Sequence, residues 1–230
     1  MSSYSLNSRS IISTALSSAM VLSLICSLSI QTGFAETPIA ETAQDVEPLQ
    51  VGQSAPRFVV KNVDNEPFSF DPNTLERPVM LVSFRGGWCP FCNMHLAELR
   101  DVIPEINALG VDMLFLSGDR PELLYKSLQR ETQEDIDGLG YQILSDADSN
   151  AAMALGIAFK ASKATIEGRN QKGQDIARSS MLLHGSLPVP SVFAIDTAGV
   201  IAFVYVNANY KVRLPAGELL QVAREISLAK

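Results

Sequence analysis

Residues 78–95 read PVMLVSFRGGWCPFCNMH, and this stretch decides the fold. An apolar run typical of a buried strand leads through two glycines to two cysteines separated by two residues. The order predicts a strand, a glycine hinge and a helix whose first turn holds Cys89. Unpaired backbone N–H groups and the positive end of the helix dipole favour thiolate over thiol there. We therefore expect Cys89 to be ionised at neutral pH and open to small oxidants.

The number of cysteines supports a reactive pair. The chain has three, and Cys26 lies in an N-terminal segment that we expect to be removed, so Cys89 and Cys92 stand alone. A disulfide that closes so small a ring removes little entropy from the unfolded chain, which argues against a purely structural bridge.

Metal binding is the competing interpretation of the same residues. Cys89, Cys92, His95 and His184 could supply four zinc ligands, but structural zinc usually needs a second close pair, and His184 is isolated in the sequence. Attachment of c-type haem is excluded, because Asn93 occupies the position where that motif requires histidine. We expect no metal or bound cofactor.

The N-terminus has the composition of a secretory signal. Residues 1–35 contain Arg9, no acidic residue and an apolar run over 11–30, followed by small residues near Ala35. We expect a signal peptide over 1–35 that is cleaved after Ala35, with an uncleaved anchor as the alternative. The mature protein is then exported, periplasmic or secreted, without stable membrane insertion.

Composition and charge limit the partners and the number of domains that the rest of the chain can have. The full chain has 18 Lys and Arg against 25 Asp and Glu, and removal of Arg9 with the signal leaves a formal charge of −8 (17 − 25). Nucleic acid is therefore not an expected partner. Residues 36–50 are expected to form a linker, and 51–230 suit one domain.

Strand and helix patterns alternate after residue 55, which is typical of an α/β fold: a central mixed sheet flanked by helices in three layers, α/β/α, with an N-terminal β-hairpin. A stretch over 160–187, rich in Lys, Gly, Gln, Asn and Ser, interrupts the alternation and is expected to be an insertion. The expected strands are 57–61, 67–70, 79–84, 111–117, 141–144, 192–195 and 200–206. The expected helices are an amphipathic one through 96–106 that ends at Gly110, one from Pro121, a short one at 150–157, and a terminal one from near Pro215.

Several segments in this order resemble the thioredoxin-fold superfamily, and within it peroxiredoxin-like proteins of the alkyl hydroperoxide reductase and thiol-specific antioxidant (AhpC/TSA) family. The resemblance spans most of the mature chain. The segments are GQSAPRF (52–58), LSGD with PE (116–122), LSDAD (144–148) with ALGI (154–157), VPSVFAIDTAG (189–199) and YVNANY (205–210).

The resemblance implies roles for residues around the cysteine pair. It makes Cys89 the attacking cysteine, Cys92 the candidate resolving cysteine and Pro190 a cis proline beside the active site, with strand entry as the alternative for Pro190. Trp88 and Pro90 belong to the same motif, and Trp88 is expected to shield the cysteines by packing.

Arg85 and His95 flank the motif. Arg85 could stabilise a thiolate or a peroxide oxygen, or be simply solvated at the end of its strand. His95 is expected to be exposed.

The sequence departs from typical peroxiredoxins at two positions. Those proteins carry Pro seven residues and Thr or Ser three residues before the attacking cysteine, where this chain has Val82 and Gly86. The WCPFC motif is instead similar to a thioredoxin-type dithiol.

The expected function is reduction of hydrogen peroxide or organic hydroperoxides through a Cys89–Cys92 dithiol/disulfide cycle, with a thioredoxin-like or other dithiol as reductant. The alternatives are a thiol-disulfide oxidoreductase that acts on protein disulfides without peroxidase activity, and a redox-inert or metal-holding binding module.

Overall fold

The computed structural model describes residues 39–126, 128 and 140–228. The predicted signal segment and its cleavage position lie outside the described residues and stay predictions. No helix in the described part is long and apolar enough to span a membrane.

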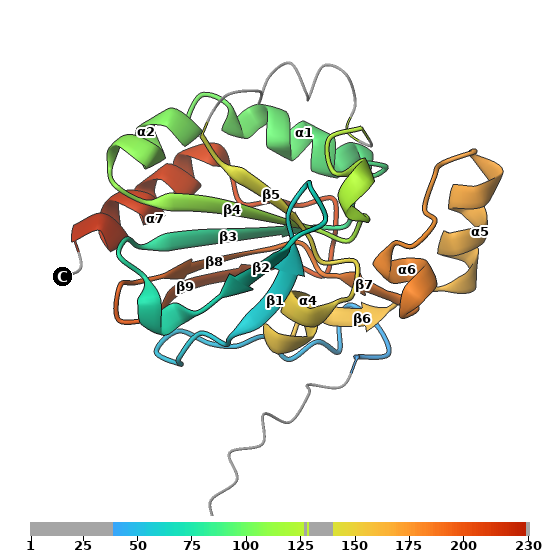
Figure 1. Ribbon diagram of the computed structural model, residues 1–230, viewed down its shortest axis with the longest axis horizontal. Helices are drawn as coiled ribbons and strands as arrows, with labels where there is room; N and C mark the ends of the chain where they lie inside the picture. The colour runs from blue at the N-terminus through green and yellow to red at the C-terminus, as the bar shows by residue number, and fades with distance from the viewer. Residues whose placement is uncertain (1–38, 127, 129–139, 229–230) are drawn as a thin grey trace, which may run out of the picture. The chain divides into compact units, whose positions relative to one another are not determined.

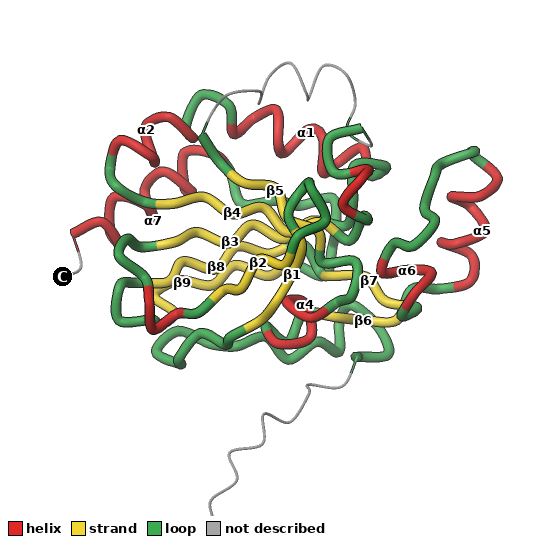
Figure 2. Tube along the Cα trace, in the orientation of Figure 1, coloured by secondary structure: helices red, strands yellow, loops and turns green. Residues whose placement is uncertain are grey.

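Seven strands form one mixed sheet in the order β2-β1-β5-β4-β3-β8-β9 (Figures 1 and 2). β3 runs parallel to β4, β4 runs parallel to β5, and β8 and β9 continue the sheet in antiparallel pairing. A separate two-stranded sheet pairs β6 with β7. The strands are β1 (Phe58–Lys61), β2 (Pro67–Phe70), β3 (Val79–Phe84), β4 (Asp112–Ser117), β5 (Gln142–Ser145), β6 (Ala158–Lys160), β7 (Ser186–Pro188), β8 (Ser191–Ile195) and β9 (Ile201–Val206).

Helices cover the sheet, and their amphipathic patterns explain where they pack. α2 contacts β4 and α7, α7 contacts β8, and α4 contacts β1. The helices are α1 (Pro90–Leu99), α2 (Ile103–Ala108), α4 (Asn150–Ala154), α5 (Lys163–Gln171), α6 (Ser180–Leu183) and α7 (Ala216–Leu228), with 3₁₀ turns at Pro72–Thr74 and Pro121–Leu123. The α/β class, the mixed sheet and the β1–β2 hairpin are as predicted.

β3 is the strand that carries the site. All six of its residues are buried, because β4 and β8 pair with its two edges and helices cover the sheet. A central strand buried on both faces needs apolar side chains at successive positions, as VMLVSF supplies. The strand therefore holds the start of the cysteine loop on a rigid support.

The helix after the cysteines differs from its prediction. The sequence predicts one helix through 96–106, but α1 ends at Leu99 and α2 starts at Ile103. Pro104 explains the break, since it has no N–H to donate to the carbonyl of Arg100 and its ring crowds that carbonyl. Gly110, with φ of +79°, ends α2 as expected.

Residues 39–50, predicted as a linker, pack on the domain. The Ala40 amide donates to the Ala158 carbonyl (2.9 Å), the Lys160 amide donates to the Ala40 carbonyl (2.8 Å), and the Leu49 amide donates to the Leu155 carbonyl (3.1 Å). The side chain of Ala43 is buried. The folded domain therefore begins before residue 51.

The predicted insertion over 160–187 connects two strands that pair with each other. β6 and β7 pair with Lys160 opposite Ser186, and α5 and α6 lie between them. None of the nine residues of α5 is buried. In Figure 1 this orange segment lies at the end of the sheet where α1 begins.

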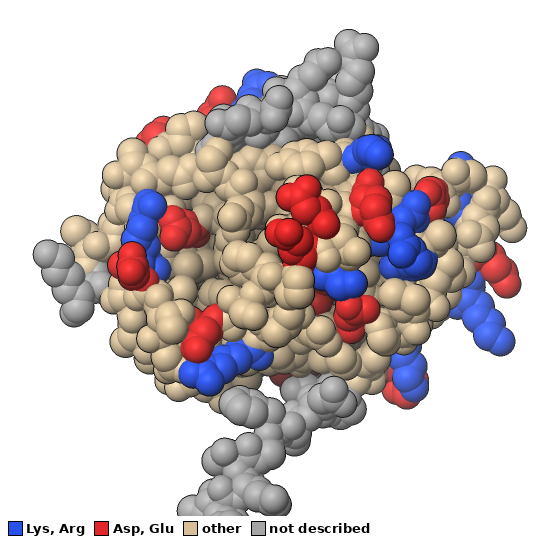
Figure 3. Space-filling model, viewed as in Figure 1, with Lys and Arg blue, Asp and Glu red and all other residues tan. Residues whose placement is uncertain are grey.

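Charged side chains of both signs are interspersed on the face shown in Figure 3. Several form exposed pairs, such as Arg77 Nη1 with Asp112 Oδ1 (3.0 Å). Exposed pairs of this kind contribute about 1 kcal/mol or less each, so the stability of the fold rests on its apolar core.

Candidate active site

The cysteine pair lies where β3 gives way to α1, as predicted. Cys89 is the N-cap of α1, with extended backbone angles (φ −92°, ψ 113°), and Pro90 occupies the first helical position. The Cys92 amide donates to the Cys89 carbonyl at 3.0 Å. Proline is favoured at this position because the first helical N–H has no partner in any case.

Two buried polar side chains hold the loop before Cys89. Asn93 Nδ2 donates to the carbonyls of Gly87 (2.6 Å) and Cys89 (3.0 Å). Asp119, which follows β4, accepts the Gly87 amide at 2.8 Å through Oδ2. No local sequence pattern predicts this contact, because only the parallel pairing of β3 and β4 brings Asp119 beside the loop.

We expect Gly86→Ala to destabilise this loop. Gly86 has φ of +145°, and an added Cβ would lie 2.5 Å from Trp88 Nε1 and 2.7 Å from Asp119 Oδ1. Strain and overlap together should lower the free energy of unfolding by about 2 kcal/mol or more. Urea denaturation measures this. Gly217→Ala, in α7 with nothing within 4 Å of the added Cβ, is the control and should be neutral or slightly stabilising. Equal midpoints for the two variants would contradict the account of the loop.

The two sulfurs share one environment but differ in ionisation. The S–H of Cys92 donates a hydrogen bond to the Cys89 sulfur, and this bond is the main reason why the pKa of Cys89 falls to about 6. The positive charges of Arg213 and Arg85 lower the pKa further, whereas burial of Cys89 opposes the change. Burial raises the pKa of Cys92 well above its ordinary value. Cys89 is therefore the thiolate of the pair at neutral pH.

The Cys89 sulfur is less open than predicted. Cys89 is 2% exposed and Cys92 is 1% exposed, so the expectation of an open sulfur is wrong for this conformation. The surroundings are nevertheless not purely apolar, because two guanidinium groups act on the sulfurs.

Arg213 lies beside the cysteine pair, and no local pattern in the sequence predicts this position. Its Nη2 lies 3.5 Å from Cys92 Sγ, and its Nη1 donates to the carbonyls of Tyr210 and Val212 (3.1 Å to Val212). The segment after β9 thus folds back over the start of α1. The only hint in the sequence was proximity to Tyr210 in the family-like tail, since 121 residues separate Arg213 from Cys92.

Arg85 is stacked and partly buried. Its guanidinium carbon lies 4.2 Å from the centre of the Tyr210 ring and 5.3 Å from that of Phe159. Tyr210 also meets Phe91 edge to face at 5.7 Å. Of the two roles considered for Arg85, simple solvation at a strand end is therefore wrong.

His95 is buried, and the prediction of an exposed side chain is wrong. Its Nε2 lies 3.1 Å from the Leu214 carbonyl oxygen. Burial and the charge of Arg213 lower the pKa of His95 to about 4, so the ring stays neutral near pH 7. His95 falls on the same helix face as Cys92 and Leu99, and this spacing was the missed signal.

Pro190 is a trans proline at strand entry, so the predicted cis bond is wrong: the described residues contain no cis peptide bond. β8 begins at Ser191, opposite Ser83, so Pro190 lies beside the carboxyl end of β3. A proline without an N–H fits the position before a strand, and its carbonyl accepts the Asn207 amide at 3.5 Å.

Trp88 packs beside the cysteines, as predicted, and is 9% exposed. Arg169, from α5, stacks on its ring at 5.0 Å, and Gln174 Nε2 donates to its carbonyl at 3.1 Å. A hollow of about 300 Å³ opens on this side, lined by Gly87, Trp88, Pro90, Leu123, Lys126, Gln174 and Asp175. The insertion therefore forms one wall of a hollow beside the cysteine loop.

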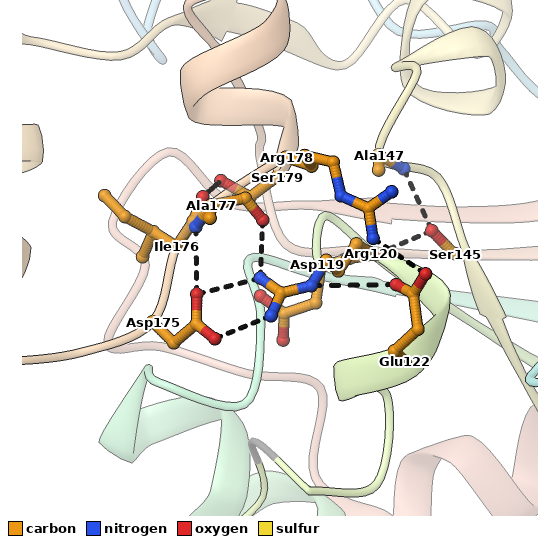
Figure 4. A network of polar contacts seen from close by, with 10 residues as sticks. All are labelled: Asp119, Arg120, Glu122, Ser145, Ala147, Asp175, Ile176, Ala177, Arg178 and Ser179. Carbon is orange, nitrogen blue, oxygen red and sulfur yellow. Dashed lines mark hydrogen bonds and ion pairs between the residues drawn. The ribbon is translucent and has the colours of Figure 1, made fainter.

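Ion pairs fasten the insertion to the loop after β4 (Figure 4). Arg120 binds the Asp175 carboxylate in bidentate fashion, with Nη1 donating to Oδ1 at 2.8 Å and Nη2 donating to Oδ2 at 2.6 Å. Its Nη1 also donates to the Ala177 carbonyl at 2.7 Å. Arg178 pairs with Glu122 at 2.7 Å. Bidentate geometry and a backbone acceptor make Arg120 the stronger anchor.

We expect Arg120→Met to loosen the insertion without unfolding the domain. The variant removes the fork on Asp175 and the bond to Ala177, so amide hydrogens over 172–179 should exchange several-fold faster. Hydrogen exchange with mass spectrometry measures this, and Arg57→Met, at an exposed ion pair with Asp71, is the control. Unchanged exchange over 172–179 would show that the ion pairs do not hold the insertion.

The described residues contain no cluster of three or more His, Cys, Asp or Glu side chains that could hold a metal. His184 instead faces Asp148, with 3.8 Å between Nε2 and Oδ1. The four zinc ligands that the sequence offered therefore do not come together.

The comparisons with known proteins agree with this geometry. The model of the AhpC/TSA family matches residues 51–204. The chain is 29% identical over 112 residues to peroxiredoxin Bcp of Escherichia coli, covering 49% of this chain and 67% of that protein. It is 22% identical over 170 residues to the thiol-disulfide oxidoreductase ResA of Bacillus thuringiensis, covering 74% of this chain and 78% of that one.

Solved structures show the same fold. A peroxiredoxin-like protein from Aquifex aeolicus superposes with a TM-score of 0.56 at 18% identity, covering 78% of this chain and 89% of that chain. Peroxidoxin BcpB from Mycobacterium tuberculosis gives a TM-score of 0.53 at 17% identity, covering 79% and 97%. With a dithiol at the start of α1 and a family match over most of the domain, this chain is a thioredoxin-fold redox protein that belongs to the AhpC/TSA family.

Proposed function

We propose that the chain is an exported thiol-dependent peroxidase that reduces hydrogen peroxide or organic hydroperoxides. The observation that carries the proposal is the asymmetric pair at the start of α1: a Cys89 thiol with a pKa of about 6 beside a Cys92 thiol that stays protonated. A nucleophile and a resolving thiol are thus within reach of each other, and neither needs a metal.

The chemistry balances with the residues present. The Cys89 thiolate attacks the hydroperoxide O–O bond, forms a sulfenic acid and releases an alkoxide or hydroxide that takes a proton from solvent. Cys92 then attacks the sulfenic sulfur, forms the disulfide and releases water. An external dithiol restores both thiols by exchange.

The buried sulfur requires a small substrate or a local movement. Because Cys89 is 2% exposed, the hydroperoxide must enter past Trp88 or the segment after β9. The hollow of about 300 Å³ beside Trp88 and Pro90 supports the first route. Its wall of insertion residues is fastened by Arg120, so the insertion sets how easily the substrate enters.

A thiol-disulfide oxidoreductase is the second candidate. Val82 and Gly86 occupy the positions where typical peroxiredoxins carry Pro and Thr or Ser, and the match to ResA covers 74% of the chain. Such a protein would exchange electrons with protein disulfides and would react slowly with peroxide.

Stopped-flow mixing of the reduced protein with hydrogen peroxide, followed by mass analysis of Cys89, separates the two candidates. The peroxidase predicts rapid sulfenic acid or disulfide formation that is first order in peroxide. A model protein that carries a disulfide bond serves as the competing substrate. Fast exchange with that disulfide, together with peroxide oxidation no faster than that of free cysteine, would favour the second candidate.

Export and the reductant belong to the same proposal. Residues 1–35 have the composition of a secretory signal, and the family suggests a thioredoxin-like or other dithiol reductant. N-terminal sequencing of the protein from the producing cell should begin at Glu36.

A further inference from the structure

A second hollow, which has Arg85 in its wall, has a volume of about 490 Å³, within the usual range for small-molecule sites. It lies between the 39–50 segment, the insertion and the segment after β9. Its walls combine an arginine, the Lys160–Glu41 ion pair, hydroxyl groups and apolar side chains, and they include Arg85, Phe159, Leu187, Ala208 and Tyr210.

Arg85 is the feature that points to a ligand. Its Nε is buried and has no hydrogen-bond partner among the described residues, and no carboxylate among them forms an ion pair with it. The charges that act on Arg85 come from Cys89, Cys92, Tyr210 and Arg213. A half-buried guanidinium without a carboxylate is costly unless an anion completes it.

Two aromatic rings lie beside this guanidinium. Tyr210 and Phe159 lie 4.2 and 5.3 Å from Arg85 Cζ. Aromatic contacts use the face of the guanidinium and leave its N–H edge to fork onto a planar anion. The other cation of the hollow, Lys160, is already paired with Glu41. Among the residues that the structure describes, the hollow therefore offers one free positive charge, which suits a monoanion better than a dianion.

We propose that this hollow, the Arg85 pocket, binds a small organic carboxylate, with the carboxylate on the edge of Arg85 and an apolar body against Phe159 and Leu187. The assignment goes beyond the peroxidase, since it does not require that the ligand be a substrate. It also couples the pocket to the dithiol, because a carboxylate and the Cys89 thiolate compete for the same charge. The disulfide form, which has no thiolate, should bind the carboxylate more tightly than the reduced form.

Titration calorimetry with octanoate and its neutral counterpart octanol tests the pocket on the unmodified protein. Octanoate should saturate one site, and octanol should bind at least about tenfold more weakly, because it lacks the charge. Equal binding of the two compounds, or no saturable octanoate binding, would overturn the proposal. The readout is heat of binding, so it stands or falls separately from peroxide turnover.

Variants and redox state locate the site. Arg85→Gln should weaken octanoate binding about tenfold or more, whereas Arg57→Gln, at an exposed pair with Asp71, should not change it. Circular dichroism checks that both variants fold. The disulfide form of the wild-type protein should bind octanoate several-fold more tightly than the reduced form at pH 8. Wild-type affinity in Arg85→Gln would refute the pocket, and tighter binding to the reduced form would refute the coupling.

Discussion

Cys89→Ser should abolish peroxide turnover, lowering the rate by roughly a thousandfold or more, because a serine hydroxyl is not ionised near pH 7 and is a far weaker nucleophile toward the O–O bond. Cys92→Ser should instead leave one peroxide-dependent oxidation per protein and no sustained turnover. Its serine hydroxyl can still donate to the Cys89 sulfur, so the thiolate keeps its main stabilising partner. Peroxide consumption and trapping of the sulfenic acid, followed by mass analysis, measure both effects.

The control for the two single variants is the double variant, Cys89→Ser with Cys92→Ser. Its rate of peroxide turnover should equal that of Cys89→Ser alone. Full turnover in Cys89→Ser would remove Cys89 from the mechanism. Sustained turnover in Cys92→Ser would mean that the external dithiol resolves the sulfenic acid directly, so that Cys92 has no catalytic role.

Arg213→Met should make the Cys89 thiol harder to ionise. The Arg213 guanidinium lies 3.5 Å from Cys92 Sγ and its charge favours the neighbouring thiolate. Removal of an opposite charge at this range raises the pKa by about one unit. Since the thiolate is the reactive form, oxidation by peroxide should slow about tenfold at pH values below 6 and change little above pH 8.

The matched control is Arg224→Met, which removes an exposed arginine of α7 paired with Glu105. It should leave the pH profile of oxidation unchanged. Arg213→Lys keeps the positive charge, so the pH profile of oxidation should stay close to that of the wild type. This variant separates an electrostatic role of Arg213 from a packing role. A profile for Arg213→Met that overlays the wild type would remove Arg213 from the site.

Local sequence patterns predicted the parts of the fold that depend on local chemistry. The apolar run of β3, a helix start beside Cys89 and the β8–β9 hairpin follow from hydrophobic period and turn residues, and each is found where expected. Pro104 shows the limit of periodicity: the apolar spacing continues through 96–106, but a missing N–H breaks the helix.

The parts of the site that could not be predicted depend on tertiary pairing. Asp119 meets Gly87 because β3 and β4 are neighbours, and Arg213 meets Cys92 because the segment after β9 folds back. The incorrect prediction of a cis bond at Pro190 came from family resemblance and not from local chemistry, and Pro190 is instead a trans proline directly before β8. The contacts of Arg169 and Gln174 with Trp88 depend on how the insertion packs, which its polar composition did not reveal.

The ionisation of the dithiol decides whether Cys89 is the nucleophile. Thiolate absorbance of the reduced protein, followed from pH 4 to pH 9, should show a first step with an apparent pKa of about 6 that belongs mainly to Cys89, while Cys92 stays protonated over this range. The account predicts that Cys89→Ser removes the first step. A first step no lower than the value of free cysteine, about 8.5, would contradict it.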